Sequence, residues 1–158
     1  VERADAPPEI IDLGKVGEVV AVDTSVISSL QAANFIPVIA PVGVDEEGNT
    51  YNINADSVAS AVAVAVGAKK LILLTDVPGV LTDQDDPNSL LATLTAGRAR
   101  ALIGAGTIGG GMVPKIEGCL RALDAGVGSV HLVDGRQPHV LLLELLTDAG
   151  VGTMLTRT

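Results

Sequence analysis

One short aliphatic run limits the folds open to this chain more than any other feature. Residues Leu71–Thr75 read Leu-Ile-Leu-Leu-Thr and are followed by the turn-forming sequence Asp76–Gly79. A continuous apolar run of this length is typical of a strand buried on both faces, as the strands of parallel sheets are. Another strand is predicted at Ser129–Val133. We therefore expect a sheet that helices cover on both faces.

Helical patterns lie between the predicted strands. Val58, Val62 and Val66 recur along one face of a helix. Gly67 is a suitable end for that helix, and Gly126 for a later one. The alternation of strands and helices is typical of the α/β fold class. The predicted helices run from a cap within Asp23–Ser25 to Ala33, from a cap at Asp56 or Ser57 to Val66, and over Thr95–Ala105, Lys115–Ala125 and Pro138–Leu146.

Further strands are predicted from more varied sequences. Ile10–Leu13 and Glu18–Val22 flank a glycine-containing turn and indicate a β-hairpin. Phe35–Val42 is apolar and β-branched, although Pro37 and Pro41 restrict its hydrogen bonding. The remaining predicted segments are a turn at Asp45–Asn49, a strand at Thr50–Ile53, a loop at Asp83–Ser89 and a strand at Gly152–Leu155.

The composition narrows the classes of function. A length of 158 residues suits a single domain, and 47% hydrophobic residues supply a core. A net charge of -9 with 1% aromatic residues argues against nucleic-acid binding, which uses basic patches and stacking side chains. No apolar run reaches the roughly 18 residues of a membrane span, no signal peptide is visible, and the lone Cys119 cannot form an internal disulfide. These features favour a cytoplasmic protein.

The segment Gly104–Lys115 is the most informative for function. Five glycines lie within Gly104–Gly111, and Lys115 follows where a helix is expected to begin. Glycine lets backbone N–H groups approach a ligand closely, and a helix N-terminus carries free donors and partial positive charge. With the charge of Lys115, the segment can bind an anion. A flexible loop followed by an ordinary surface lysine explains the same residues.

Two shorter motifs have both a functional and a structural interpretation. Asn52, Asn54 and Asp56 fall on one side of an extended segment, where they could hold a carboxylate substrate and orient lysines. An Asx cap at a strand-to-helix junction also explains them. Thr75–Val80 could line a nucleotide pocket, or could be a turn that ends a strand.

The C-terminal part offers a looser set of candidates, His131, Glu144 and Gly150. A lone histidine on a strand is more often structural, and no serine or cysteine nucleophile motif accompanies it. No Cys/His cluster indicates zinc, and no glycine loop ends in the Gly-Lys-Ser/Thr of P-loop proteins. No metal ligand is therefore predicted in the chain.

In this order, Tyr51–Asp56, Leu71–Gly79, Gly109–Lys115 and Val133–Arg136 resemble the amino acid kinase family, and the likeness runs from about Pro8 to Thr153. Within that family, the chain is similar to the members that transfer the ATP γ-phosphoryl group to the side-chain carboxylate of N-acetyl-L-glutamate, in arginine biosynthesis. The resemblance implies a three-layer αβα sandwich with a mainly parallel sheet.

The resemblance also implies that residues 1–158 form one unit, the C-terminal, ATP-binding half. The family's N-terminal half, which holds most of the acetylglutamate site, a glycine-rich strand and a second catalytic lysine, has no counterpart here. We therefore expect the isolated chain to lack full activity. We also expect it to expose sheet edges and apolar surface where the other half packs.

The resemblance assigns roles to residues one by one. Lys115 would stabilise charge on the transferring phosphoryl group, Asp56 would orient the catalytic lysines, and Asn52 would contact acetylglutamate. ATP would carry Mg²⁺ into the site, so that charge neutralisation and positioning supply the catalysis. The residues that match nucleotide-contacting positions are Thr75, Asp76, Val77, Pro78, Gly79, Val80, Thr107, Ile108 and Gly109.

Regulation and assembly follow from the resemblance only as hypotheses. His131, Glu144 and Gly150 match an L-arginine effector site of some members, and a homo-oligomer, dimer or hexamer, is implied for the full-length enzyme. Binding of the PII signalling protein is left undecided. Two alternatives stay open: a sister kinase that acts on aspartate, glutamate, carbamate or a nucleoside monophosphate, and a non-catalytic arginine- or nucleotide-binding module.

Overall fold

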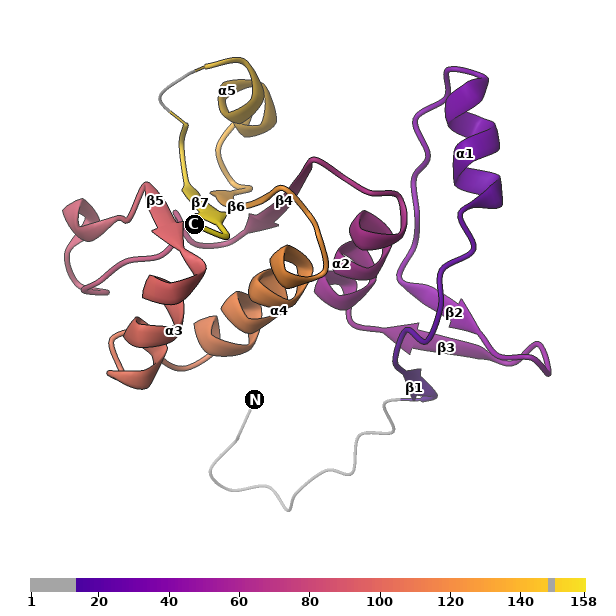
Figure 1. The fold of residues 1–158 in the computed structure, drawn as a ribbon, viewed down its shortest axis with the longest axis horizontal. Helices are drawn as coiled ribbons and strands as arrows, with labels where there is room; N and C mark the ends of the chain where they lie inside the picture. Colours follow the sequence, from indigo (N-terminus) through magenta and orange to yellow (C-terminus); the bar gives the residue numbers. More distant parts are fainter. Residues whose placement is uncertain (1–13, 148–149) are drawn as a thin grey trace, which may run out of the picture.

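The two main predicted strands are neighbours in a four-stranded sheet. The computed structural model describes residues 14–147 and 150–158 (Figure 1). Strand β4 (Lys70–Thr75) pairs in parallel with β6 (Ser129–Asp134), and Leu71 lies beside Val130. Strand β7 (Thr153–Thr156) is antiparallel to β6. Strand β5 (Thr93–Thr95), which no local pattern predicted, is parallel to β7. The strand order is β4-β6-β7-β5.

Helices cover both faces of this sheet and confirm the expected α/β sandwich. Helices α2 (Ala55–Ala65), α3 (Ala96–Gly104) and α4 (Met112–Asp124) lie on one face, and α5 (Val140–Leu146) lies on the other (Figure 1). The main core forms between the sheet and the three-helix face. Its largest fully buried side chains include those of Leu94, Ile116, Leu123, Leu132 and Leu155.

The helix ends follow local chemistry. Gly67 and Gly126 have φ angles of +62° and +111° directly after the caps of α2 and α4, so both predicted stops are confirmed. Helix α2 is capped by Asn54, which accepts a hydrogen bond from the N–H of Ser57, rather than by Asp56 or Ser57. Helix α4 begins at Met112 rather than Lys115, because Pro114 is compatible with a first helical turn.

A second, three-stranded sheet replaces the predicted hairpin. Strand β1 (Val16–Gly17) pairs in parallel with β3 (Thr50–Ile53), and β2 (Val42–Val44) pairs antiparallel with β3. Ile10–Leu13 lies outside the described residues, and Glu18–Val22 forms no strand, so the hairpin prediction was wrong. Strand β1 pairs with β3, which is distant in the sequence, and not with the adjacent segment that the hairpin pattern implied.

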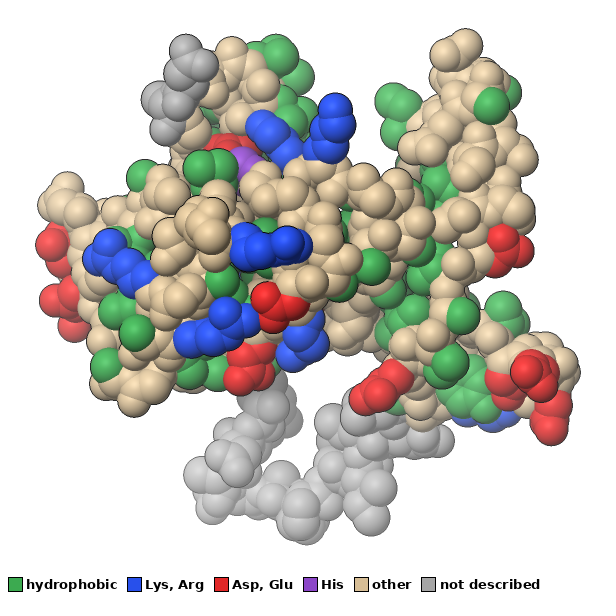
Figure 2. All heavy atoms as spheres, viewed as in Figure 1, with side chains coloured by type: hydrophobic (Ala, Val, Ile, Leu, Met, Phe, Trp, Pro, Cys, Tyr) green, Lys and Arg blue, Asp and Glu red, His purple; other side chains and the backbone are tan. Residues whose placement is uncertain are grey.

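Residues 18–44 form an arm that stands away from the four-stranded sheet (Figure 1). Its helix α1 (Ser25–Ala32) has no buried residue, and Ile36 and Val38 are 90% and 96% exposed. The strand predicted at Phe35–Val42 was wrong: pairing begins only at Val42, because the two prolines remove backbone donors and, within the described part of the chain, no strand pairs with residues 35–41. Figure 2 shows hydrophobic side chains on the surface of the arm.

Two further features complete the fold. The loop predicted at Asp83–Ser89 contains a short 3-10 helix, η1 (Pro87–Ser89). Within residues 14–147 and 150–158, no helix is both long enough and apolar enough to cross a membrane.

Candidate functional site

An ion pair joins the first two candidate catalytic residues. Lys115, on α4, donates from Nζ to Oδ2 of Asp56, on the first turn of α2, at 2.6 Å. The residues are 59 positions apart in the sequence. Both side chains are partly exposed, at 24% and 43% respectively, so that the ammonium is held in place and still open to a ligand. Packing of α2 against α4 therefore creates a positioned cation that neither local motif predicts alone.

The glycine loop leads directly into α4. Gly110 has a φ of +56°, which glycine adopts without strain, whereas Gly109 and Gly111 have no such φ. A Cβ added at Gly109, Gly110 or Gly111 would meet no protein atom within 4 Å. Packing within the protein thus does not require glycine at Gly109 or Gly111. The missing side chains leave open space beside the N–H groups at the start of α4, as an anion-binding helix terminus needs.

The turn after β4 and the glycine loop both line a hollow of about 690 Å³, here called the turn hollow. Its size lies within the range of about 300–1,000 Å³ typical of small-molecule sites. All of the predicted nucleotide-binding residues except Thr75 line this hollow. The hydroxyl of Thr75 instead donates a hydrogen bond to the carbonyl of Val77, within the turn, at 2.7 Å. The lining also includes Leu81, Gln84, Gly110, Gly111, Met112, Lys115 and Arg136.

A second hollow, here called the strand hollow, opens between β1 and α2 and has a volume of about 900 Å³. Its lining includes Gly17, Asn54, Asp56 and Lys115. Lys115 therefore lines both hollows, and so does Gly111. Asn52, the predicted substrate contact, is exposed on β3 and lines neither hollow.

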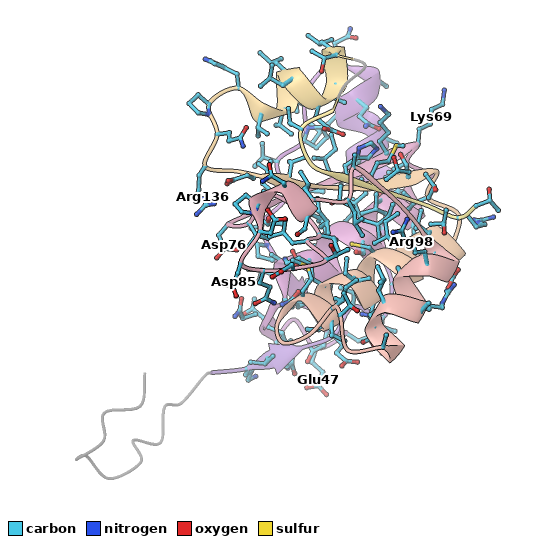
Figure 3. The ribbon with its side chains drawn as sticks, turned by 90° about the vertical axis from the view of Figure 1, so that its left-hand side faces the viewer. Glu47, Lys69, Asp76, Asp85, Arg98 and Arg136 are labelled. Atoms are coloured by element: carbon cyan, nitrogen blue, oxygen red, sulfur yellow. The ribbon has the colours of Figure 1, made fainter. Side chains whose placement is uncertain are left out.

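An ion pair between Asp134 and Arg136, here called the clasp, lies at the rim of the turn hollow and was not predicted from local patterns. Asp134 ends β6 beside Thr75, and its two carboxylate oxygens accept hydrogen bonds from Nε and Nη2 of Arg136, each at 2.8 Å. Side-chain and backbone hydrogen bonds from Arg136 lower the pKa of Asp134 to about 2. Figure 3 shows Arg136 and Asp76 projecting from the same side of the molecule. The motif Val133–Arg136 was part of the family resemblance, but no role for Arg136 was predicted from it.

The C-terminal candidates meet on the other face of the sheet. Nδ1 of His131, on β6, lies 2.5 Å from Oε1 of Glu144, on α5, and the two side chains are only 3% and 7% exposed. The other carboxylate oxygen of Glu144 accepts a hydrogen bond from the N–H of Val151. Gly150 adjoins this carboxylate, since an added Cβ would lie 3.4 Å from Oε2. The structure thus brings His131, Glu144 and Gly150 together.

Within the described residues, neither the single cysteine nor a cluster of metal-ligating side chains offers an alternative site. Cys119 is fully buried on α4, and burial raises the pKa of its thiol to about 12, which removes it as a nucleophile at neutral pH. Among the described residues, no three His, Cys, Asp or Glu side chains gather in a way that could hold a metal ion. The glycine loop, the turn after β4 and the Lys115–Asp56 pair remain the best candidate for a reactive centre.

Curated relatives match this chain over nearly its whole length. An acetylglutamate kinase of Symbiobacterium thermophilum is 54% identical over 157 residues, and one of Oleidesulfovibrio alaskensis is 58% identical over 157 residues. These matches cover 99% of this chain but only 54% and 52% of the two relatives. The chain therefore spans about half the length of the curated relatives that it matches.

Solved structures give the same picture. The crystal structure of smu.665 from Streptococcus mutans has 38% sequence identity to this chain and a TM-score of 0.72. The match covers 92% of this chain and 52% of the smu.665 chain. The N-acetylglutamate synthase of Neisseria gonorrhoeae, solved with coenzyme A and L-arginine, has 29% sequence identity to this chain and a TM-score of 0.81. The match covers 99% of this chain and 36% of the synthase chain. The model of the amino acid kinase family matches residues 2–134. The chain accordingly belongs to the amino acid kinase family.

Proposed function

We propose that the chain is the ATP-binding part of an enzyme that transfers the γ-phosphoryl group of ATP to the side-chain carboxylate of N-acetyl-L-glutamate. The observation that carries the proposal is that Lys115 lines both hollows. A phosphoryl group that passes from a donor in the turn hollow to an acceptor in the strand hollow would pass this ammonium. The relatives named acetylglutamate kinase supply the substrate class.

The residues present suit a nucleotide. The open space at Gly109–Gly111 and the N-terminus of α4 would take the phosphates, and the aliphatic wall of Val77, Pro78 and Ile108 would pack on the nucleoside. Mg²⁺ carried by ATP would neutralise part of the phosphate charge. Phosphoryl transfer passes through a loose transition state, which positioning and charge stabilise. Lys115 would supply that charge, and Asp56 would fix the ammonium before substrate arrives.

The acceptor side is only partly built by this chain. The strand hollow opens beside β1 and the arm, where apolar residues such as Ile36 and Val38 are exposed. We propose that the additional half found in the relatives covers the arm and supplies most of the acetylglutamate site, including a second catalytic lysine. Asn52 is exposed on β3 outside both hollows, so it would contact only a part of the substrate that extends beyond the strand hollow.

Regulation by L-arginine is a separate proposal on the other face of the sheet. The His131–Glu144 pair and Gly150 would bind the effector, with the carboxylate of Glu144 facing a guanidinium. A solved relative with 29% identity contains L-arginine. A homo-oligomer of the full-length enzyme, dimer or hexamer, is proposed from the family resemblance alone.

Calorimetry on the 158-residue chain tests the nucleotide site. We expect ATP-Mg to bind, and Lys115→Ala to weaken binding, whereas Lys69→Ala, an exposed control outside both hollows, should not. Lack of ATP binding, or equal effects of the two variants, would contradict the proposal. Binding of L-arginine without ATP would favour the alternative of an arginine-binding module.

A turnover assay tests the reaction itself. The chain would be joined to the N-terminal half of the Symbiobacterium relative, and acyl phosphate would be trapped with hydroxylamine. Lys115→Ala should then reduce kcat by roughly 10²-fold or more, the effect of losing one transition-state charge contact. A kcat close to that of the unmodified fusion would remove Lys115 from catalysis. Asn52→Ala should raise KM for acetylglutamate more than KM for ATP.

A further inference from the structure

We infer that Arg136 binds the base end of the nucleotide, with the flat face of its guanidinium stacked on the purine at the rim of the turn hollow. The inference rests on the proposed function, because it assumes that the turn hollow binds ATP. It adds a binding residue that acts on the nucleoside rather than on the phosphates.

The first support is the position in which Arg136 is held. Asp134 and Thr75 are paired residues at the carboxyl ends of two adjacent parallel strands, the edge where α/β proteins bind ligands. Asp134 accepts hydrogen bonds from Nε, Nη2 and the backbone N–H of Arg136. These hydrogen bonds hold the guanidinium along one edge. Its side chain is 66% exposed although it is anchored.

The second support is the local charge. Asp134 already balances the guanidinium, and the nearby Asp76 raises the pKa of Arg136 further. Two carboxylates beside one cation make a poor site for a polyphosphate, which carries several negative charges. The glycine loop and Lys115, elsewhere on the lining of the same hollow, provide the phosphate-binding groups. The nucleotide is thus expected to point its base, and not its phosphates, towards Arg136.

The third support is the lack of another stacking group. The two aromatic residues of the chain, Phe35 and Tyr51, line neither hollow. The apolar lining of the turn hollow is aliphatic, from Val77 and Pro78 to Ile108 and Met112. An arginine guanidinium is planar and weakly hydrated, and stacks on aromatic rings. In this hollow it supplies the flat cationic surface that a purine packs against.

Calorimetry with two ligands separates the base from the phosphates. The probes are ATP-Mg and inorganic tripolyphosphate, and the variants are Arg136→Ala, Arg136→Lys and the control Arg98→Ala, whose side chain is on the opposite side in Figure 3. We expect Arg136→Ala to weaken ATP binding roughly tenfold, the scale of a cation–π contact. Tripolyphosphate binding should be unchanged. Arg136→Lys should resemble Arg136→Ala, because lysine keeps the charge and loses the plane.

Three results would overturn the inference while the nucleotide site stands. These are an unchanged ATP affinity in Arg136→Ala, an equal loss for tripolyphosphate, and full retention of affinity in Arg136→Lys. The last two would make Arg136 a simple charge contact. If the unmodified chain binds neither ATP nor tripolyphosphate, the proposed function fails and the role of Arg136 falls with it. Circular dichroism of each variant checks that this exposed substitution leaves the fold intact.

Discussion

Replacing Gly79 by alanine is expected to destabilise the protein by about 2–6 kcal/mol. Gly79 lies in the turn that walls the turn hollow and has a φ of +147°. An added Cβ would lie 2.6 Å from Oγ1 of Thr153 and 2.9 Å from Cδ1 of Leu90. A non-glycine residue in such a sparsely populated backbone conformation costs about 1–3 kcal/mol, and overpacking of a buried site costs about 1–3 kcal/mol.

Urea denaturation followed by circular dichroism measures this effect. The matched control is Gly97→Ala on α3, where an added Cβ meets no atom within 4 Å and φ is not positive. That control should stabilise the protein by about 0.5–1 kcal/mol, because alanine loses less backbone entropy in a helix. The two alanines should therefore change the unfolding free energy in opposite directions.

A double-mutant cycle tests the physical cause. Thr153→Ala removes the closest atom, but also the oxygen that accepts a hydrogen bond from the N–H of Val80 at 2.8 Å, so alone it should cost about 1–3 kcal/mol. In that background, Gly79→Ala should cost less by about 1 kcal/mol or more. A loss below about 0.5 kcal/mol for Gly79→Ala, or strict additivity of the cycle, would refute the reasoning.

Three further predictions concern titration, reactivity and the C-terminal pair. The pKa of Asp134 should be about 2 in an NMR titration and should return towards 3.8 in Arg136→Ala. Because the folded-state pKa is lowered, the clasp stabilises the fold fully above about pH 4, and this stabilisation is lost as the pH falls towards 2. Cys119 should not react with a thiol reagent at pH 8 until the protein is unfolded, because a pKa of about 12 leaves roughly one thiol in 10⁴ ionised. Rapid labelling of the native protein would contradict the burial of Cys119. Glu144→Ala should lower the unfolding free energy by about 2–5 kcal/mol in calorimetry, because it leaves His131 and the backbone N–H of Val151 without their hydrogen-bond partner. A change below about 0.5 kcal/mol would show that the His131–Glu144 pair does not stabilise the fold.

Local sequence patterns were reliable where burial and turn chemistry act on neighbouring residues. The aliphatic runs formed β4 and β6, and Gly67 and Gly126 followed their helices, because a buried strand and a helix end depend on nearby side chains. The predictions failed at Glu18–Val22 and over most of Phe35–Val42, because among the described residues no strand pairs with these segments before Val42 joins β3. A strand needs a partner ladder, and its position is not encoded in the strand itself.

The sequence by itself determined the α/β class, the family and the list of residues with suitable chemistry. The tertiary structure alone decided which of them meet: Lys115 pairs with Asp56 across 59 positions and lines both hollows, whereas Asn52 stays outside them. It also decided that Arg136, clasped by Asp134, lines the same hollow as the glycine loop. The reason is physical, since contacts between distant segments depend on how α2, α4 and the strand ends pack together, and no local pattern records that packing.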